Sequence, residues 1–389
     1  MICFSLWSIL SAKHKVSAKK TQRMRKKILT VIGTRPNYIK VTQFEKEFSK
    51  FPDEFEYRLL HTGQHYDRNM RDIFFEQLKL NKVDYALGIN RGTPGAQVGE
   101  IIMKMDTVLQ EWKPDILIVV GDVNSTLAAS VAANKANVKL AHVESGLRSH
   151  DPAMPEEWNR LVTDQLANIL FVTEKSGKEN LLKEGKKEEQ IFFVGNTMID
   201  TLVAFEDDIE SSDVLKKLKL DANTYVLMTI HRPSNVDQQN SLKKLADLIQ
   251  FVSAKYNVVF PIHPRSMKNI EKFGMKKMFS ENKNLLLIEP LDYLSFQKLI
   301  KHCKLVITDS GGIQEETTFR QIPCLTLREN TERPITIELG SNELIPFELS
   351  VLEEKISSIE NGSFKKGTIP PLWDGKATER IVGVLRGIL

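Results

Sequence analysis

The amino-acid sequence predicts an α/β protein made of two doubly wound, Rossmann-like domains that face a central cleft. The main observation is a series of short apolar runs, each separated from the next by a segment with helical periodicity. Such alternation is typical of parallel sheets with right-handed crossovers. The runs form two series of roughly 170 residues each, and a chain of 389 residues is long enough for two domains of ordinary size.

The apolar runs are expected to be buried strands. In the first series they are 27–33, 57–63, 115–122, 139–144, 169–173 and 190–195. In the second series they are 225–231, 257–263, 284–290, 304–310 and 323–327. Helical segments such as 99–112 and 125–136 lie between them. We therefore expect domains at 24–200 and 201–370, joined near 195–210. A helix at 371–389 follows, and its packing partner cannot be read from the pattern.

The charge of the chain is unevenly distributed. Residues 1–23 carry five basic side chains and no acidic one, which exceeds the whole net charge of +4. The rest of the chain is therefore close to neutral, and a nucleic-acid partner is not expected. In 1–23 an apolar segment precedes the basic one, the reverse of a secretory signal. We expect a poorly ordered basic extension, with a weak membrane-surface anchor as the less favoured alternative. Stable membrane association is not expected, because no apolar run reaches roughly 18 residues.

Several common cofactor and metal motifs are missing from the sequence. Three scattered cysteines have neither disulfide nor zinc spacing, which favours a cytoplasmic location. There is no G-x-G-x-x-G and no G-x-x-x-x-G-K-[ST], so neither a dinucleotide nor a triphosphate site of those types is indicated. There is also no Asp-x-Asp and no His/Cys cluster. We therefore expect no cofactor and no metal.

Charged side chains follow an unusual number of the predicted strands. In the first series they are Arg35, His61, His65, Asp122, Glu144 and Arg148, and in the second His231, Arg232, His263, Arg265, Asp309, Glu315 and Glu316. Ligands of doubly wound sheets bind at the carboxyl ends of the strands, so these positions predict a binding cleft.

The stretch DSGGIQEE predicts an anion site in the second domain. Gly311 and Gly312 allow close approach of a ligand, and the helix that follows Ser310 presents free N–H groups suited to a diphosphate. Glu316 is placed to accept two hydroxyls of a ribose, and Arg333 to contact a phosphate. A serine-capped helix with favourably placed acids is the alternative.

Three carboxylates of the first domain are candidate catalysts, each with a structural alternative. Asp122 precedes a helix and is equally typical of a helix cap. Glu144 ends a mostly buried strand, where a carboxylate needs a partner or a role, and we expect Arg148 as its partner. Glu156 falls in a first helical turn beside Glu157, where an ordinary ion pair with Arg160 is the alternative. In the second domain, His231 is either structural or positioned for phosphate binding or proton transfer.

Ten motifs in order resemble those of the non-hydrolysing UDP-N-acetylglucosamine 2-epimerases, which have the two-domain glycosyltransferase-B type fold. They are GTRPNYIK, HTGQHYDRNM, GDVNSTLA, HVESGLRS, MPEEWNR, VGNTMID, IHRPSN, PIHPR, TDSGGIQEE and TERP. The resemblance implies reversible epimerisation at C2 by elimination and re-addition of UDP through a 2-acetamidoglucal. It also implies a homodimer and a supply of sugar for surface polysaccharide.

The resemblance also implies roles for individual residues. Catalytic roles fall on Asp122, Glu144, Glu156 and His231. Substrate-binding roles fall on Arg35, Lys40, Arg148, Arg232, Ser310, Gly311, Gly312, Glu316 and Arg333. Gln64 and His65 match a region that binds an activating second UDP-sugar in some members.

Four alternatives to this function stay open. A 2-epimerase acting on a UDP-diacetamido sugar or its uronic acid, a hydrolysing 2-epimerase, and a glycosyltransferase of the same fold share the chemistry or the fold. A nucleotide-sugar sensor without enzymatic activity is disfavoured, because binding alone does not require clustered acids beside an anionic ligand.

Overall fold

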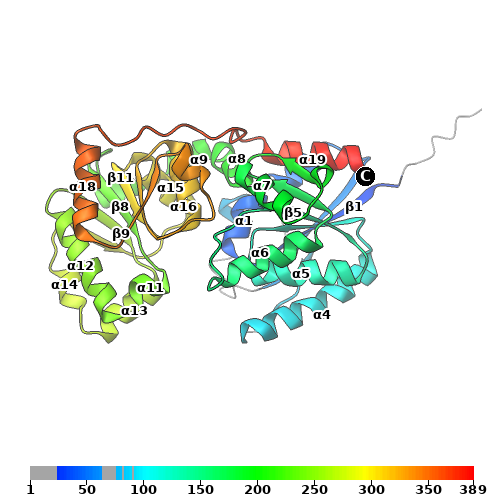
Figure 1. Ribbon diagram of the computed structural model, residues 1–389, viewed down its shortest axis with the longest axis horizontal. Helices are drawn as coiled ribbons and strands as arrows, with labels where there is room; N and C mark the ends of the chain where they lie inside the picture. Colours follow the sequence, from blue (N-terminus) through cyan, green and yellow to red (C-terminus); the bar gives the residue numbers. More distant parts are fainter. Residues whose placement is uncertain (1–23, 64–75, 81–82, 90–91) are drawn as a thin grey trace, which may run out of the picture.

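A computed structural model describes residues 24–63, 76–80, 83–89 and 92–389. Over these residues the chain forms two parallel sheets in two separate lobes (Figure 1). The first sheet has the order β3-β2-β1-β4-β5-β6-β7 and the second the order β10-β9-β8-β11-β12-β13. In each sheet the order reverses beside the first strand of its series, which defines the doubly wound topology. The predicted fold class is confirmed.

The strands agree with the predicted runs except for β3 and β13, which were not predicted. All the predicted strands except β12 end one or two residues earlier than expected. In the first lobe they are β1 Lys26–Ile32, β2 Phe55–His61, β3 Tyr85–Ala86, β4 Ile116–Val120, β5 Lys139–Val143, β6 Ile169–Val172 and β7 Ile191–Phe193. In the second they are β8 Tyr225–Thr229, β9 Asn257–Pro261, β10 Leu285–Ile288, β11 Leu305–Thr308, β12 Cys324–Leu327 and β13 Asn342–Ile345. The polar residues at the ends of the predicted runs therefore lie in turns, at the edge where ligands bind.

Helices separate the strands and cover both faces of each sheet. In the first lobe they are α1 Arg35–Val41, α2 Phe44–Phe48, α4 Pro94–Trp112, α5 Asn124–Lys135, α6 Pro155–Leu166, α7 Lys175–Lys183 and α8 Thr197–Ala204. The second lobe has α9 Glu206–Ser211, α10 Val214–Leu218, α11 Pro233–Val236, α12 Gln239–Ser253, α13 Pro264–Lys272 and α14 Lys276–Ser280. They are followed by α15 Tyr293–His302, α16 Gly311–Arg320, α17 Ile335–Glu338 and α18 Leu349–Glu360. The final helix, α19 Ala377–Ile388, lies on the first lobe.

Burial on both faces explains why the strands are almost continuously apolar. On β1, Ile28 and Ile32 belong to the core on one face of the sheet, whereas Leu29 and Val31 belong to the core on the other. The second sheet likewise has one core on each face. Parallel sheets covered by helices on both sides have this sequence pattern.

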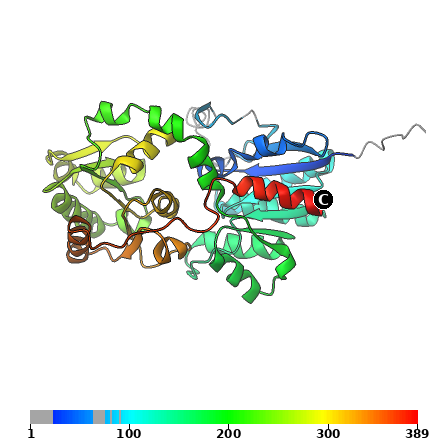
Figure 2. The same ribbon diagram turned by 90° about the horizontal axis from the view of Figure 1, so that it is seen from above.

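The chain crosses between the lobes twice, and the two crossings pack against each other. The first leaves α8, and the second runs from α18 back to α19 on the first lobe (Figures 1 and 2). Asp200 on α8 accepts hydrogen bonds from the backbone N–H groups of Ala377 (2.9 Å) and Thr378 (2.6 Å). Helix α19 thus finds its partners in α2 and α8 of the first lobe, so the last helix of the sequence completes the first domain.

Candidate functional site

The carboxyl ends of β4 and β5 carry the two predicted carboxylates nearest the centre of the first sheet. Asp122 lies in the turn after β4, and Glu144 follows β5 with φ of 68° and is buried. A Cβ atom on Gly121 would lie 3.1 Å from Glu144 Oε2. The two turns are therefore in contact, and the carboxylates belong to one site.

Each of these carboxylates is paired with a basic side chain from another helix. Lys40 of α1 donates to Glu144 Oε2, while Glu144 Oε1 is buried and has no hydrogen-bond partner among the described residues. Arg160 of α6 donates to Asp122. Burial works to raise the pKa of Asp122, but Arg160, Lys40 and Arg333 lower it overall. Asp122 is an ion-pair partner and not the cap of α5, whose N-cap position is Val123.

The start of α6 separates the roles of two neighbouring acids. Glu157 is buried and accepts hydrogen bonds from the backbone N–H groups of Ser149 (2.9 Å) and His150 (3.0 Å). It also lies 3.2 Å from Arg160, which is the ion pair predicted for this helix start. Glu156 is exposed and forms no hydrogen bond or ion pair with the described part of the chain. Glu156 is therefore the acid of this pair that has no structural task in the fold.

Arg148 does not pair with Glu144, and that prediction is wrong. Its guanidinium binds Asp164 (2.7 Å) and Glu184 (2.8 and 2.7 Å) and also donates to the carbonyl of Leu147. These contacts hold it inside the first domain. Lys40 takes its place because α1 lies next to both strand ends in space, although it is 104 residues away in sequence.

The loop before α1 is organised by an asparagine. Asn37 Oδ1 accepts from the backbone N–H groups of Gly33 and Thr34, both at 3.1 Å, and Nδ2 donates to the Val120 carbonyl at 3.0 Å. The turn after β1 is thereby fastened to the end of β4. Arg35, the first residue of α1, is half-buried and faces the second domain, where it contributes to lowering the pKa of His263 after burial, His231 and Arg265.

The predicted anion site of the second domain has the expected local structure. Helix α16 begins at Gly311, directly after Ser310 in the N-cap position, and Ser310 makes no side-chain capping bond. A Cβ on Gly311 would lie 2.7 Å from Arg333 Nη1 and 2.9 Å from Glu332 Oε1, whereas one on Gly312 meets no atom closer than 3.8 Å. Gly311 is thus required for the close approach of Arg333 to the helix start.

Arg333 connects the acids of the two domains. Its Nε lies 2.8 Å from Glu315 Oε2, and its Nη1 donates to Glu332. Glu332 also lies 2.9 Å from Arg328 and 3.7 Å from Arg160 of the first domain. Although burial works to lower the pKa of Arg333, the acids Glu315, Glu332, Glu144 and Asp122 raise it well above its usual range. The result is a cluster of mostly buried acidic and basic side chains that spans both domains.

The turn after β8 is held by one buried carboxylate. Asp309 accepts from the backbone N–H groups of His231 (3.0 Å) and Arg232 (2.8 Å) and from Asn235 Nδ2 (2.9 Å). His231 Nδ1 lies 3.0 Å from Asp309, and its side chain remains 45% exposed. Arg232 Nε donates to the Asp309 carbonyl at 3.1 Å. His231 is therefore oriented by a carboxylate while its other face stays open.

Glu316 lies inside the second domain on α16. Burial raises its pKa to about 7, with Gln297 and Arg320 acting in the opposite direction. Glu174, at the end of β6, also has a pKa raised to about 7 by burial. Both carboxyls therefore change charge close to neutral pH.

The remaining predictions concern other features. Gln64 and His65 lie outside the described residues. Among the residues that the structure describes, no group of three or more His, Cys, Asp or Glu side chains has the arrangement of a metal site, and no helix is long and apolar enough to cross a membrane. Cys303 and Cys324 are buried free thiols.

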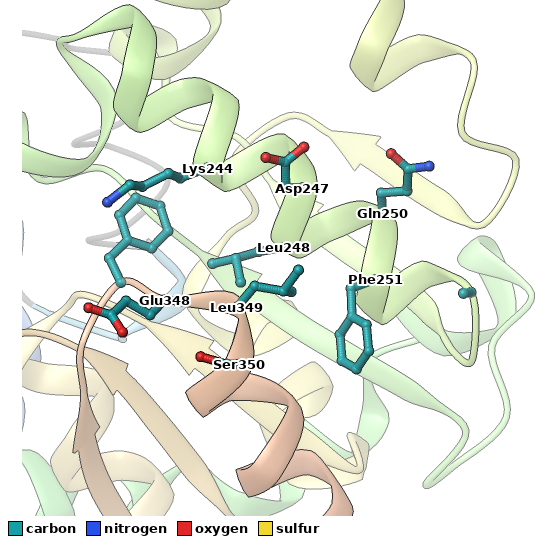
Figure 3. Close-up of a pocket in the computed structure, with 10 residues that line it drawn as sticks. Lys244, Asp247, Leu248, Gln250, Phe251, Glu348, Leu349 and Ser350 are labelled. Atoms are coloured by element: carbon teal, nitrogen blue, oxygen red, sulfur yellow. The ribbon is translucent and has the colours of Figure 1, made fainter.

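Two cavities lie in the second domain. One of about 470 Å³ is lined by Arg232, Asn235 and Arg328 together with Asp151 of the first domain, so it adjoins the charged cluster. The other, of about 740 Å³, lies between α12 and the start of α18 (Figure 3). It contains none of the predicted site residues, and its lining mixes Leu248 and Phe251 with Lys244, Asp247 and Glu348. We therefore place the functional site at the facing strand ends.

Several residues of the site were not found from the sequence. They are Asn37, Arg160 as the partner of Asp122, Arg328 and Glu332. Their motifs PNYIK, PEEWNR and TERP gave some signal, because charged residues recur there after predicted strands. Glu315 is next to Glu316 in sequence, but a single sequence does not tell which of two adjacent acids points into a cleft.

The fold and site together define a class: a two-domain α/β enzyme of glycosyltransferase-B type with paired carboxylates at the cleft. The family model described as UDP-N-acetylglucosamine 2-epimerase matches residues 46–386. A UDP-N-acetylglucosamine 2-epimerase of Methanococcus maripaludis is 40% identical over 93% of this chain and 98% of its own. A UDP-2,3-diacetamido-2,3-dideoxy-D-glucuronate 2-epimerase of Pseudomonas aeruginosa is 38% identical over 82% of this chain and 88% of its own.

A solved structure supports the same assignment. The UDP-GlcNAc 2-epimerase of Methanocaldococcus jannaschii, in complex with UDP-GlcNAc and UDP, superimposes with a TM-score of 0.84 at 38% identity, covering 93% of this chain and 99% of that one. The protein belongs to the UDP-N-acetylglucosamine 2-epimerase family and is an isomerase.

Proposed function

We propose that the protein interconverts UDP-N-acetylglucosamine and UDP-N-acetylmannosamine by elimination and re-addition of UDP. The observation that carries the proposal is the state of Glu144. Lys40 binds one carboxylate oxygen, and the other is buried without a partner among the described residues. Buried polar atoms are nearly always paired, so this unpaired oxygen, on a carboxylate whose other oxygen Lys40 holds, is suited to a group on a ligand.

The proposed reaction balances in atoms and electrons. A carboxylate of the first domain takes the C2 proton, the C–H electrons form the C1=C2 bond, and the C1–O bond breaks with its electrons on UDP. The reverse steps add UDP and deliver a proton to the opposite face of C2. Removal and delivery on two faces require two acid–base groups, and we assign them among Asp122, Glu144, Glu156 and His231.

In this proposal the second domain binds UDP. The N–H groups at the start of α16, after Ser310 and at Gly311 and Gly312, are assigned to bind the diphosphate, and Arg333 lies against this helix start. Elimination increases the negative charge on the leaving diphosphate, so donors fixed in advance stabilise the transition state. Glu316 binds the ribose, and Arg35, Lys40 and Arg232 contribute positive charge.

Product analysis tests the proposal. The protein is incubated with UDP-N-acetylglucosamine, and the mixture is followed by proton NMR. We expect a mixture of two UDP-sugars at equilibrium, whereas accumulation of free sugar and UDP would indicate a hydrolysing epimerase. Consumption of UDP-N-acetylglucosamine only when an acceptor is added would indicate a glycosyltransferase.

A modified sugar is the second candidate substrate. The relative from Pseudomonas aeruginosa is named for a UDP-diacetamido-glucuronate, and its identity to this chain is close to that of the archaeal relative. Parallel assays with both UDP-sugars decide between them by kcat/KM. A homodimer, a cytoplasmic location, activation through Gln64 and His65, and a supply of sugar for surface polysaccharide stay predictions.

A further inference from the structure

A fully buried histidine on β5 lies beside the turns after β4 and β5, which carry Asp122 and Glu144. It has no part in the reaction proposed above. His142 Nε2 lies 2.8 Å from the Gly121 carbonyl oxygen, and Nδ1 lies 2.6 Å from Asp164 Oδ1. Both neighbours are acceptors, so both contacts are hydrogen bonds only when each ring nitrogen carries a proton. With Asp164 ionised, this geometry requires a proton on each ring nitrogen of His142.

Asp164 connects this histidine to the second catalytic turn. It lies on α6, is fully buried, and accepts from Gly146 N–H (3.0 Å) and Arg148 Nη2 (2.7 Å) in addition to His142. Burial works to raise the pKa of Asp164, but His142 and Arg148 lower it overall. One ionised carboxylate thus joins α6, the turn after β5 and, through His142, the turn after β4.

The turn after β4 is held along its length by side chains. Three consecutive carbonyls accept hydrogen bonds from three different elements: Val120 from Asn37 (3.0 Å), Gly121 from His142 (2.8 Å) and Asp122 from Asn159 (2.8 Å). Gly121 itself has φ of 68°, so its carbonyl direction is not set by regular strand geometry. His142 is the group that sets it.

Stability alone does not account for this pair. A buried ion pair is often replaceable by apolar side chains of similar volume without loss of stability, because desolvation offsets the Coulomb attraction. What apolar residues do not provide is direction: the pair points one donor at the Gly121 carbonyl and one carboxylate at Gly146. The other charged groups near it are Arg148, Glu184 and Lys186.

We propose that His142 and Asp164 are positioning residues, whose charged pair fixes the turns after β4 and β5 and so aims Asp122 and Glu144 at the reacting carbon. The catalytic consequence rests on the proposed function, whereas the protonation of His142 does not. Neither side chain touches the substrate. Both act through the backbone that carries the catalytic carboxylates.

The protonation state is measured directly by 15N NMR of histidine side chains in the unmodified protein. His142→Gln identifies the signal by its disappearance. We expect both ring nitrogens of His142 to carry protons at pH 7, and a neutral tautomer with one protonated nitrogen would overturn the proposal. This measurement needs no activity, so it stands even if no epimerisation is found and the proposed function fails.

Kinetics test the positioning role. In His142→Gln a single amide nitrogen replaces two donor nitrogens, so the side chain can donate to the Gly121 carbonyl or to Asp164 but not to both. One of the two contacts that fix the turns is lost, and we expect kcat to fall about 100-fold. The proposed UDP site, at the start of α16, lies in the other domain. The Kd for UDP, measured by calorimetry, is therefore expected to stay within about twofold. The control His302→Gln changes a histidine on α15, far from these turns, and is expected to leave kcat unchanged.

A second variant separates positioning from charge. In Asp164→Asn the amide can donate to His142 Nδ1, which leaves a neutral ring with Nε2–H still on the Gly121 carbonyl. We therefore expect this variant to keep part of its activity, with kcat about tenfold below that of the unmodified protein. Unchanged kcat in His142→Gln, or a loss of UDP affinity as large as the loss of kcat, would overturn the proposal. If His142→Gln does not fold, Asp164→Asn and the NMR measurement decide.

Discussion

The ligand-facing edges of the two sheets differ in the chemical groups that they present. In the first domain, carboxylates follow β4 and β5, and Asp122 and Glu144 are each paired with a basic residue from a separate helix. In the second, β11 is followed by Ser310, Gly311 and the start of α16, with Arg333 packed against it. The first edge presents acids, and the second presents N–H groups and a guanidinium.

This difference indicates a division of labour between two domains of the same topology. Proton transfer needs carboxylates with defined partners, whereas holding a diphosphate needs donors and positive charge. The account therefore predicts that changes at one edge affect turnover and changes at the other affect UDP binding. The variants below test that separation, beginning with the largest expected effect.

Glu144→Gln removes the carboxylate with the unpaired oxygen while keeping its size. We expect kcat to fall about 1000-fold, within the range typical of a lost acid–base group, and the Kd for UDP to change little. Steady-state kinetics and calorimetry measure the two quantities. The control Glu111→Gln changes an exposed acid on α4 and should behave as the unmodified protein. Near-normal turnover in Glu144→Gln would contradict the assignment of Glu144 as an acid–base catalyst.

Gly195→Ala tests the contact between the loop that precedes α8 and the segment that returns from α18 to α19. Gly195 has φ of 89°, and a Cβ there would lie 2.1 Å from the Leu372 carbonyl oxygen. Gly185 has φ of 85° but no atom within 4 Å of such a Cβ, so Gly185→Ala has only the conformational cost. We expect losses in the free energy of unfolding of about 1 kcal/mol at Gly185 and about 3 kcal/mol at Gly195.

Urea unfolding measures both glycine variants. Equal losses would show that the contact between Gly195 and Leu372 carries no additional stability. A larger loss in Gly195→Ala, accompanied by a fall in both turnover and UDP affinity, would show that the crossings set the geometry shared by the two edges.

Gly311→Ala tests the second edge alone. The added methyl group would meet Arg333 Nη1 at 2.7 Å, and this guanidinium is held by Glu315 and Glu332 and cannot move freely. We expect UDP to bind about tenfold more weakly, a change of about 1.4 kcal/mol. Gly383→Ala, in α19 with open space around it, is the control and should bind UDP normally. Equal UDP affinity in both variants would contradict the assignment of the UDP site to the start of α16.

The charge of Glu316 gives the smallest expected effect. Because the pKa of this carboxyl is raised to about 7, its ionised form is lost as pH falls below 7. If it binds the ribose as a carboxylate, UDP affinity should be about threefold lower at pH 6.5 than at 7.5. Glu316→Gln removes this part of the pH dependence and leaves that of UDP itself, so identical pH profiles of the two proteins would exclude the role.

The same pKa shift has a consequence for stability. The folded state binds a proton more tightly than the unfolded chain, in which an ordinary Glu titrates near 4.5. The contribution of Glu316 to stability is therefore fully present below about pH 4.5 and is lost as pH rises toward 7, and Glu174 acts in the same direction. Any binding gained by ionising Glu316 is thus obtained at some cost in fold stability.

The sequence predicted the architecture because buried parallel strands leave a local signal. Runs such as ILIVV at β4 are recognisable alone, whereas β13, with the sequence NELI, is half polar and was missed. The partners within the site were harder to predict, since they depend on which elements become neighbours in space. Arg148 is four residues from Glu144 yet binds Asp164, while the true partner, Lys40, comes from α1. His142 opens the motif HVESGLRS, but the sequence alone does not distinguish a positioning histidine at the end of a strand from an ordinary core residue.

The central claim is that a carboxylate of the first domain removes the C2 proton while the second domain holds UDP. Proton NMR of UDP-N-acetylglucosamine in D2O tests it most directly, with the unmodified protein and Glu144→Gln compared at saturating substrate. We predict that deuterium appears at C2 in both UDP-sugars with the unmodified protein, and that Glu144→Gln binds UDP but exchanges about 1000-fold more slowly. Epimerisation without deuterium at C2, or exchange at the same rate in the variant, would contradict the account.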